Sequence, residues 1–125
     1  SLFFALDEAL KLIREEGLGK RFERHRICSE AFYNAIEALN LMSLPKKEDR
    51  SRTVIALRKP ANMDNAEVRR IMRERYRVII DGGAGKLREE IFRIGSMGGV
   101  SEVEVTQTIA ALEGALTEAK FPLNV

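Results

Sequence analysis

The side chain with the clearest potential for chemistry is Arg93, a lone arginine inside the apolar, strand-like segment 91–95. Small residues follow it, at Ser96 and Gly98, and leave its surroundings open. A guanidinium in such a setting can pair with a carboxylate through two parallel hydrogen bonds, which a lysine cannot do. Because neighbouring strand residues point to opposite faces of a sheet, the pattern fits an arginine that points to water equally well.

A glycine-rich segment, residues 81–86, precedes this arginine and raises the question of phosphate binding. Its end looks like a P-loop, but Ile80 and Leu87 stand where that pattern requires glycine and then Ser or Thr. A dinucleotide-binding fingerprint fails too, for want of its third glycine. We therefore interpret the segment as a conformational turn, with direct phosphate contact as the lesser alternative. The glycines concerned are Gly82, Gly83 and Gly85.

His25 and Cys28 lie three residues apart in a predicted helix, a spacing that would let a thiol nucleophile meet its base. A cysteine on a helix face is more often a small packed residue, so we expect a structural role for Cys28. Only one cysteine and one histidine are present, which is too few for a zinc site and excludes an intramolecular disulfide. The single thiol favours a reducing, cytoplasmic setting.

Charge gives no sign of a nucleic-acid or membrane partner, since 21 basic and 19 acidic residues leave a net charge of +2. No apolar run approaches the roughly 20 residues that cross a bilayer. The adjacent carboxylates Glu15-Glu16 and Glu89-Glu90 point in different directions and lack the geometry of general acid-base catalysis. The remaining basic cluster is interrupted by acidic residues, lacks aromatic residues for base stacking, and is interpreted as part of a mobile surface loop. It comprises Lys46, Lys47, Arg50 and Arg52.

The elements that must position these residues follow from periodicity and capping signals. Apolar residues that recur at spacings of three and four predict helices over residues 2–16, 19–40, 64–76 and 101–116. Asp64 and Ser101 each precede a glutamate by three residues, Glu67 and Glu104, a spacing typical of helix N-termini. Short β-branched segments bounded by polar residues predict strands over residues 53–57, 77–80 and 91–95.

The predicted order of elements is α-α-β-α-β-β-α, without regular alternation of strands and helices. This order predicts an α+β fold, in which a small, mostly antiparallel sheet of three to four strands is covered on one face by helices. The polar stretch 43–52 is predicted to be a surface loop. A chain of 125 residues has room for one such domain.

The string Phe92-Arg93-Ile94-Gly95-Ser96-Met97-Gly98 resembles the closing signature of the class V, fold-type I aminotransferases, the alanine-glyoxylate and serine-pyruvate group. Residues 15–26 resemble the entry to that family's long helix, and residues 76–83 resemble its strand and glycine turn. The likeness extends in order and spacing from Leu2 to about Leu116. It implies that residues 1–125 are a C-terminal small domain. Residues 1–40 would be its linking helices and residues 53–118 its α/β core.

The resemblance implies an enzyme that uses pyridoxal 5'-phosphate to move an amino group from an alanine- or serine-type amino acid to a glyoxylate- or pyruvate-type 2-oxo acid. Arg93 falls on the family's arginine that binds the substrate α-carboxylate and so orients the substrate. Gly82, Gly83 and Gly85 match a family turn near the substrate, for which shape rather than contact is expected. The complete enzyme is expected to be a homodimer.

In this family the residues that hold the cofactor belong to a large domain that precedes the segment seen here. No lysine of this chain lies in a stretch that resembles the cofactor-lysine motif; the lysines are Lys11, Lys20, Lys46, Lys47, Lys59, Lys86 and Lys120. The resemblance therefore implies that the chain alone neither holds the cofactor nor transaminates. Ser96 stands where relatives often carry histidine, so substrate preference cannot be transferred. The alternative function is a free-standing α+β module that binds a small ligand or a protein without catalysis.

Overall fold

A computed structural model describes residues 1–122 of the chain, and these residues form an α+β fold, as predicted. The elements are α1 (Leu2–Glu16), α2 (Leu18–Ala38), β1 (Met42–Ser43), β2 (Val54–Arg58), α3 (Asn65–Tyr76), β3 (Ile91–Gly95) and α4 (Glu102–Glu118). Two 3-10 turns interrupt the loops, η1 (Lys47–Asp49) and η2 (Gly85–Leu87). Within the described residues no helix is both long and apolar enough to cross a membrane.

The three strands form one antiparallel sheet in the order β1-β2-β3. Side chains alternate along β2 and β3, so that one face of the sheet is buried beneath the helices. That face carries Ile55, Leu57, Phe92 and Ile94, which join α2, α3 and α4 in one core. The opposite face carries Ala56 and Arg93, which are register partners and only half-buried. We call this second surface the open face of the sheet.

The prediction of a strand over residues 77–80 is wrong, because these residues do not pair with the sheet. Arg77 closes α3 in the left-handed conformation with φ 58°, and the Val78 N–H bonds back to the Met72 carbonyl. The backbone is thus used to end the helix, and only Asp81 pairs with β3, through an isolated bridge to Arg93. The short strand β1 lies at the start of a stretch predicted as loop. With the Asp81 bridge counted and β1 set aside, the order is the predicted α-α-β-α-β-β-α.

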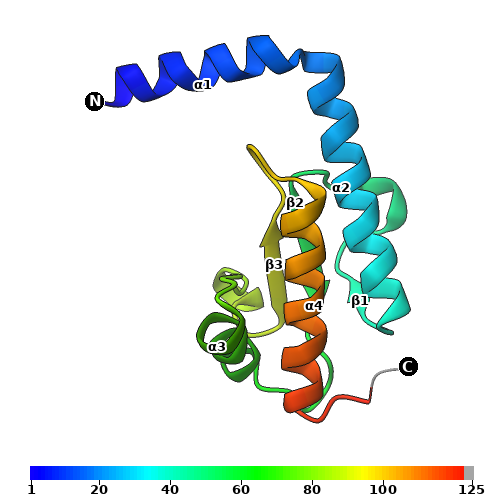
Figure 1. Ribbon diagram of the computed structural model, residues 1–125. Coiled ribbons are helices and arrows are strands. Elements are labelled where there is room, and N and C mark those ends of the chain that lie inside the picture. Colours follow the sequence, from blue (N-terminus) through cyan, green and yellow to red (C-terminus); the bar gives the residue numbers. More distant parts are fainter. Residues whose placement is uncertain (123–125) are drawn as a thin grey trace.

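The helix N-termini follow the capping signals in the sequence. Asp64 accepts a hydrogen bond from the Ala66 N–H at 2.9 Å, and Ser101 with Glu104 forms a complete capping box at the start of α4. Glu67 does not complete a box at α3, because its carboxylate pairs with Arg70 one turn later. Three of the four side chains in these signals therefore make cap contacts, and two of the three belong to α4, which lies beside β3 (Figure 1).

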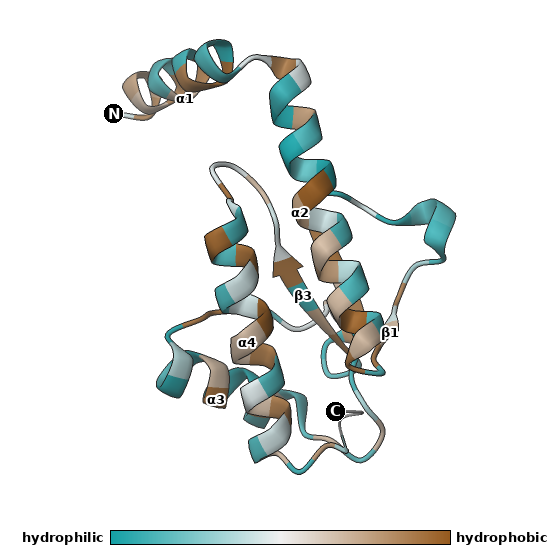
Figure 2. Ribbon diagram, turned by 45° about the vertical axis from the view of Figure 1, so that its right-hand side comes forward, coloured by the Kyte–Doolittle hydropathy of each residue, from teal (hydrophilic) through white to brown (hydrophobic). Residues whose placement is uncertain are grey.

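Helix α1 projects away from the rest of the structure at the N-terminal end of α2 (Figure 1). None of its residues is buried, and Figure 2 shows an apolar stripe along it. Its direction is fixed by Arg24, whose guanidinium donates to both Glu16 oxygens and to the Val100 carbonyl, at 2.6 Å for the last contact. One side chain therefore connects α1, α2 and the turn before α4.

Candidate functional site

Arg93 lies in the middle of β3 on the open face of the sheet, and its side chain is 40% exposed. Its Nε donates to the Gly82 carbonyl at 2.6 Å, and its Nη2 donates to Asp81 Oδ2 at 2.9 Å. The guanidinium is therefore neither free in bulk water nor enclosed. It is held against the chain at the edge of a cavity.

The glycine segment forms the turn that the sequence predicts. A Cβ on Gly83 would lie 2.0 Å from the Leu87 carbonyl oxygen, and a Cβ on Gly82 would lie 2.6 Å from the Arg88 carbonyl oxygen. Only glycine permits so close an approach of two backbone segments. Gly85 has φ +55°, which a residue with a side chain rarely adopts. The Gly82 carbonyl also contacts Arg93 directly, a contact that the sequence did not predict.

A cavity of about 440 Å³ opens between this turn, α3 and β3. Three arginines line it, Arg69, Arg88 and Arg93, together with two carboxylates, Asp81 and Glu89. Asp81 lies between Arg69 and Arg93. The three guanidinium groups exceed the two carboxylates by one positive charge, which suits an anionic ligand such as a carboxylate. No lysine lines the cavity among the described residues, so it offers no amine to bind the cofactor that the family resemblance implies. We therefore derive no cofactor chemistry from this cavity.

Sequence reasoning missed four residues of this site: Asn65, Arg69, Asp81 and Arg88. The buried Asn65 amide donates to the Ile91 carbonyl at 2.7 Å and accepts from Arg69 Nε at 2.7 Å. Arg69 Nη1 lies 3.9 Å from Asp81 Oδ1. The spacing of Asn65 and Arg69, one helical turn apart, was the available signal for this pair. Nothing in the sequence signalled that α3 would lie beside the glycine turn.

His25 and Cys28 are both buried, with 8% and 2% of their surfaces exposed. His25 Nδ1 lies 2.8 Å from the Arg21 carbonyl of its own helix, so this nitrogen is used within α2. Burial raises the pKa of the Cys28 thiol, which is the opposite of what a nucleophilic thiolate requires. The expected structural role of Cys28 is consistent with this packing.

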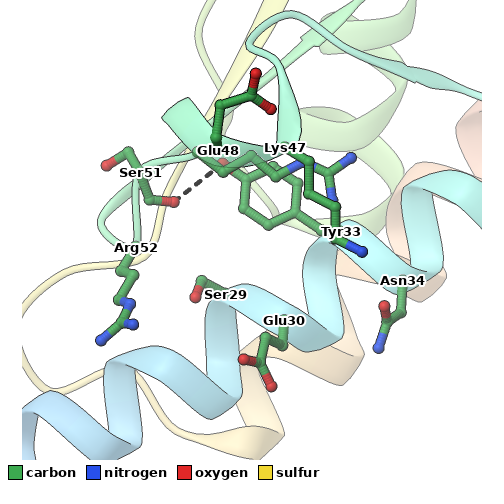
Figure 3. A pocket seen from close by; sticks show the side chains of 9 residues that line it. Ser29, Glu30, Tyr33, Asn34, Lys47, Glu48, Ser51 and Arg52 are labelled. Atoms are coloured by element: carbon green, nitrogen blue, oxygen red, sulfur yellow. Dashed lines mark hydrogen bonds between the residues drawn. The ribbon is translucent and has the colours of Figure 1, made fainter.

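In the basic loop, Arg50 is packed against α2. Arg50 stacks over the Tyr33 ring, with its Cζ 4.5 Å from the ring centroid, and pairs with Glu37 at 2.7 Å. Tyr33 in turn donates to the Ser51 carbonyl, and these contacts line a cavity of about 450 Å³ between α2 and η1 (Figure 3). Three basic side chains, Lys47, Arg50 and Arg52, and two acidic ones, Glu30 and Glu48, line this cavity. Because Arg50 is paired with Glu37, two basic and two acidic side chains remain, and the cavity has no net charge that would select a ligand.

No group of three His, Cys, Asp or Glu side chains within the described part of the chain is placed to hold a metal ion. The chemistry that the geometry offers is thus the binding of an anion at Arg93.

No protein-family model matches the chain. The chain is 36% identical to an uncharacterized aminotransferase of Methanocaldococcus jannaschii over 99% of its own length and 32% of the relative. It is 34% identical to the serine–glyoxylate aminotransferase of Arabidopsis thaliana, over 98% of the chain and 31% of that protein. The crystal structure of ureidoglycine-glyoxylate aminotransferase from Bacillus subtilis matches with a TM-score of 0.93 and 30% identity, over 98% of this chain and 32% of that one.

The chain thus spans about one third of the length of the relatives it matches, and it matches their C-terminal part. The likeness covers the helices, the sheet and the Arg93 strand alike, and it confirms the resemblance carried by the residues themselves. The chain belongs to the class V aminotransferases of the alanine-glyoxylate and serine-glyoxylate group, as their C-terminal domain.

Proposed function

We propose that this chain is the C-terminal small domain of a pyridoxal-phosphate-dependent transaminase, and that Arg93 binds the α-carboxylate of the substrate. The enzyme would move an amino group between an alanine- or serine-type amino acid and a glyoxylate- or pyruvate-type 2-oxo acid. One observation carries the proposal: a guanidinium is held on the open face of the sheet, at the edge of a cavity lined by three arginines and two carboxylates.

When bound, pyridoxal phosphate supplies the electron sink for breaking the bond at the substrate Cα. The contribution of this chain is orientation. A carboxylate held by two parallel hydrogen bonds to Arg93 cannot rotate, and a fixed substrate places its Cα–H toward the rest of the active site. The rigid strand β3 supports this function, because its backbone is paired on both sides, with β2 and with Asp81.

The remaining parts of the enzyme would lie outside this chain. The exposed apolar side chains of α1, among them Leu6 and Leu10, fit a helix that links to a large domain and packs against it. The exposed Ile79, two residues before Asp81, would likewise be covered. We propose that residues 1–40 link the two domains, residues 53–118 form the α/β core, and the complete enzyme is a cytoplasmic homodimer. Without a cofactor lysine, the chain alone would not transaminate.

The test is the Arg93→Lys variant of the full-length enzyme, with Arg58→Lys as the control. Lysine keeps the positive charge but loses the planar two-point contact, so we expect the KM for amino acid and 2-oxo acid to rise at least tenfold. Cofactor absorbance should be unchanged. Arg58 lies on the neighbouring strand β2 and forms no hydrogen bond through its side chain with the described residues, so its replacement should leave the kinetics as they are. Unchanged kinetics in Arg93→Lys would refute the proposed role.

A further inference from the structure

The two carboxylate oxygens of Asp81 have different partners. Oδ1 accepts a hydrogen bond from the Gly82 N–H at 2.8 Å and lies 3.9 Å from Arg69 Nη1. Oδ2 accepts from Arg93 Nη2 at 2.9 Å. Asp81 and Arg93 also exchange both backbone hydrogen bonds, at 3.1 and 2.8 Å, so their side chains leave the same face of the sheet as a directly opposed pair.

The contacts of Arg93 use one particular edge of its guanidinium. Nε and Nη2 point their hydrogens to the same side of the planar group, and these two atoms bind the Gly82 carbonyl and the Asp81 carboxylate. The other edge, formed by Nη1 and the second hydrogen of Nη2, has no hydrogen-bond partner within residues 1–122. That edge has the two parallel donors that a carboxylate prefers.

Asp81 is positioned by a series of contacts that begins at Asn65 in the core and passes through Arg69. The side chain of Asn65 is buried, with 1% of its surface exposed, and orients Arg69 through the 2.7 Å contact to Nε. Arg69 faces the Oδ1 side of Asp81, and the Gly82 N–H fixes the same oxygen. Oδ2 is therefore directed to Arg93 by groups on two separate segments, α3 and the glycine turn.

We propose that Asp81 is a positioning residue for carboxylate recognition. It binds the Nε–Nη2 edge of Arg93 together with the Gly82 carbonyl, and thereby presents the Nη1–Nη2 edge to the carboxylate of the incoming substrate. This inference rests on the proposed role of Arg93 and extends it to a second residue. An arginine side chain has many rotamers, and holding one of them before binding removes an entropic cost from the binding step.

The opposite effect, in which Asp81 repels the substrate carboxylate or competes for Arg93, is the weaker one on this geometry. Asp81 occupies an edge of the guanidinium that the substrate does not need. Its side chain is 71% exposed, so solvent and salt screen its charge. A nearby second cation, Arg69, offsets that charge further. Positioning and repulsion predict changes of opposite sign, which makes them separable.

The experiment compares Asp81→Ala, Asp81→Asn and Arg93→Lys in the full-length enzyme, with Glu90→Gln as the matched control. Glu90 belongs to the loop directly before β3, and its carboxylate forms no salt bridge within the described residues, so this variant removes the same charge without touching Arg93. KM and kcat are measured for the amino acid and the 2-oxo acid. Circular dichroism and cofactor absorbance show that each variant is folded and loaded.

Positioning predicts that Asp81→Ala raises KM about tenfold for both substrates, with kcat changed less than about twofold, since the bond-breaking groups are untouched. Asp81→Asn keeps one oxygen, which can serve Arg93 or Gly82 but not both, and should give an intermediate KM. Glu90→Gln should match the wild type. These results together would support the inference.

Three outcomes would overturn it. A KM that falls in both Asp81 variants would show repulsion, and a KM that stays constant in Asp81→Ala while Arg93→Lys raises it would show that Asp81 only supports the fold. A rise in Glu90→Gln equal to that in Asp81→Ala would show a general charge effect. If Arg93→Lys itself leaves KM unchanged, the failure lies in the proposed function of Arg93 rather than in the role of Asp81 alone.

Discussion

Replacing Gly83 by alanine tests the glycine turn that holds Arg93. The added Cβ would lie 2.0 Å from the Leu87 carbonyl oxygen and 2.4 Å from its carbon, and both are backbone atoms that cannot rotate away. Gly83 has no positive φ, so alanine is sterically allowed by the backbone angles alone and the effect comes from the clash. The turn must therefore open by about 1.4 Å or more, because ordinary contacts of a Cβ begin at 3.4 Å.

Overpacking of this kind costs about 2–3 kcal/mol in the free energy of unfolding. At about 2 cal/mol/K of unfolding entropy per residue, a chain of this length should lose about 10 °C in its melting temperature. Thermal and urea unfolding of the 125-residue chain, followed by circular dichroism at 222 nm and at low protein concentration, would measure it. Because Gly82 would move with Gly83, the contact to Arg93 should weaken too.

Gly19→Ala is the matched control. Gly19 lies in α2 with nothing within 4 Å of its added Cβ. Because alanine favours the helix over glycine by up to about 1 kcal/mol, the variant should keep the melting temperature or raise it. If Gly83→Ala melts at the wild-type temperature, the close approach of the turn to η2 is not a constraint on this fold, and the account given for the glycines is wrong.

Three further predictions concern the helices. The isolated chain should self-associate through the exposed apolar residues of α1, and Leu6→Glu with Leu10→Glu should shift it to monomer in analytical sedimentation; a wild-type chain that stays monomeric at high concentration would contradict this. Ser101→Ala should lower the unfolding free energy by about 1 kcal/mol in urea titrations, because it removes the capping box of α4. The hydrogen bond from Arg24 lowers the pKa of Glu16 from 4.5 to about 2. A depressed carboxyl pKa stabilises the fold above pH 4.5 and ceases to do so as the pH falls toward 2, so the stability difference between wild type and Glu16→Gln should shrink over that window.

Local patterns in the sequence predicted most of the elements. Helix periodicity and the caps at Asp64 and Ser101 place α3 and α4 nearly to the residue, because these signals depend on contacts within one or two turns. The strand 91–95 and the turn at the glycines were predicted for the same reason. Arg93 was identified as a charged residue in an apolar strand, but the sequence did not decide which face of the sheet it occupies.

The prediction failed where the same backbone groups could either end a helix or pair in a sheet. Residues 77–80 have the composition of a strand, but ending α3 in a left-handed residue at Arg77 takes their hydrogen-bonding groups, and pairing begins only at Asp81. The choice between closing a helix and extending a sheet depends on where the partner strand lies, which is a tertiary property. The packing of Arg50 against Tyr33 of α2 was not predicted either, because it joins side chains from two separate segments.

The sequence alone determined the α+β class, the helix boundaries and the identity of the arginine available for an anion. Tertiary structure decided what surrounds that arginine: Asp81 opposite it across an isolated bridge, Arg69 brought alongside from α3, and the open sheet face on which all three meet. Helix periodicity and capping arise from neighbours along the chain. The contacts that hold the Arg93 guanidinium come from segments far apart in the sequence, which are brought together by the packing of the core.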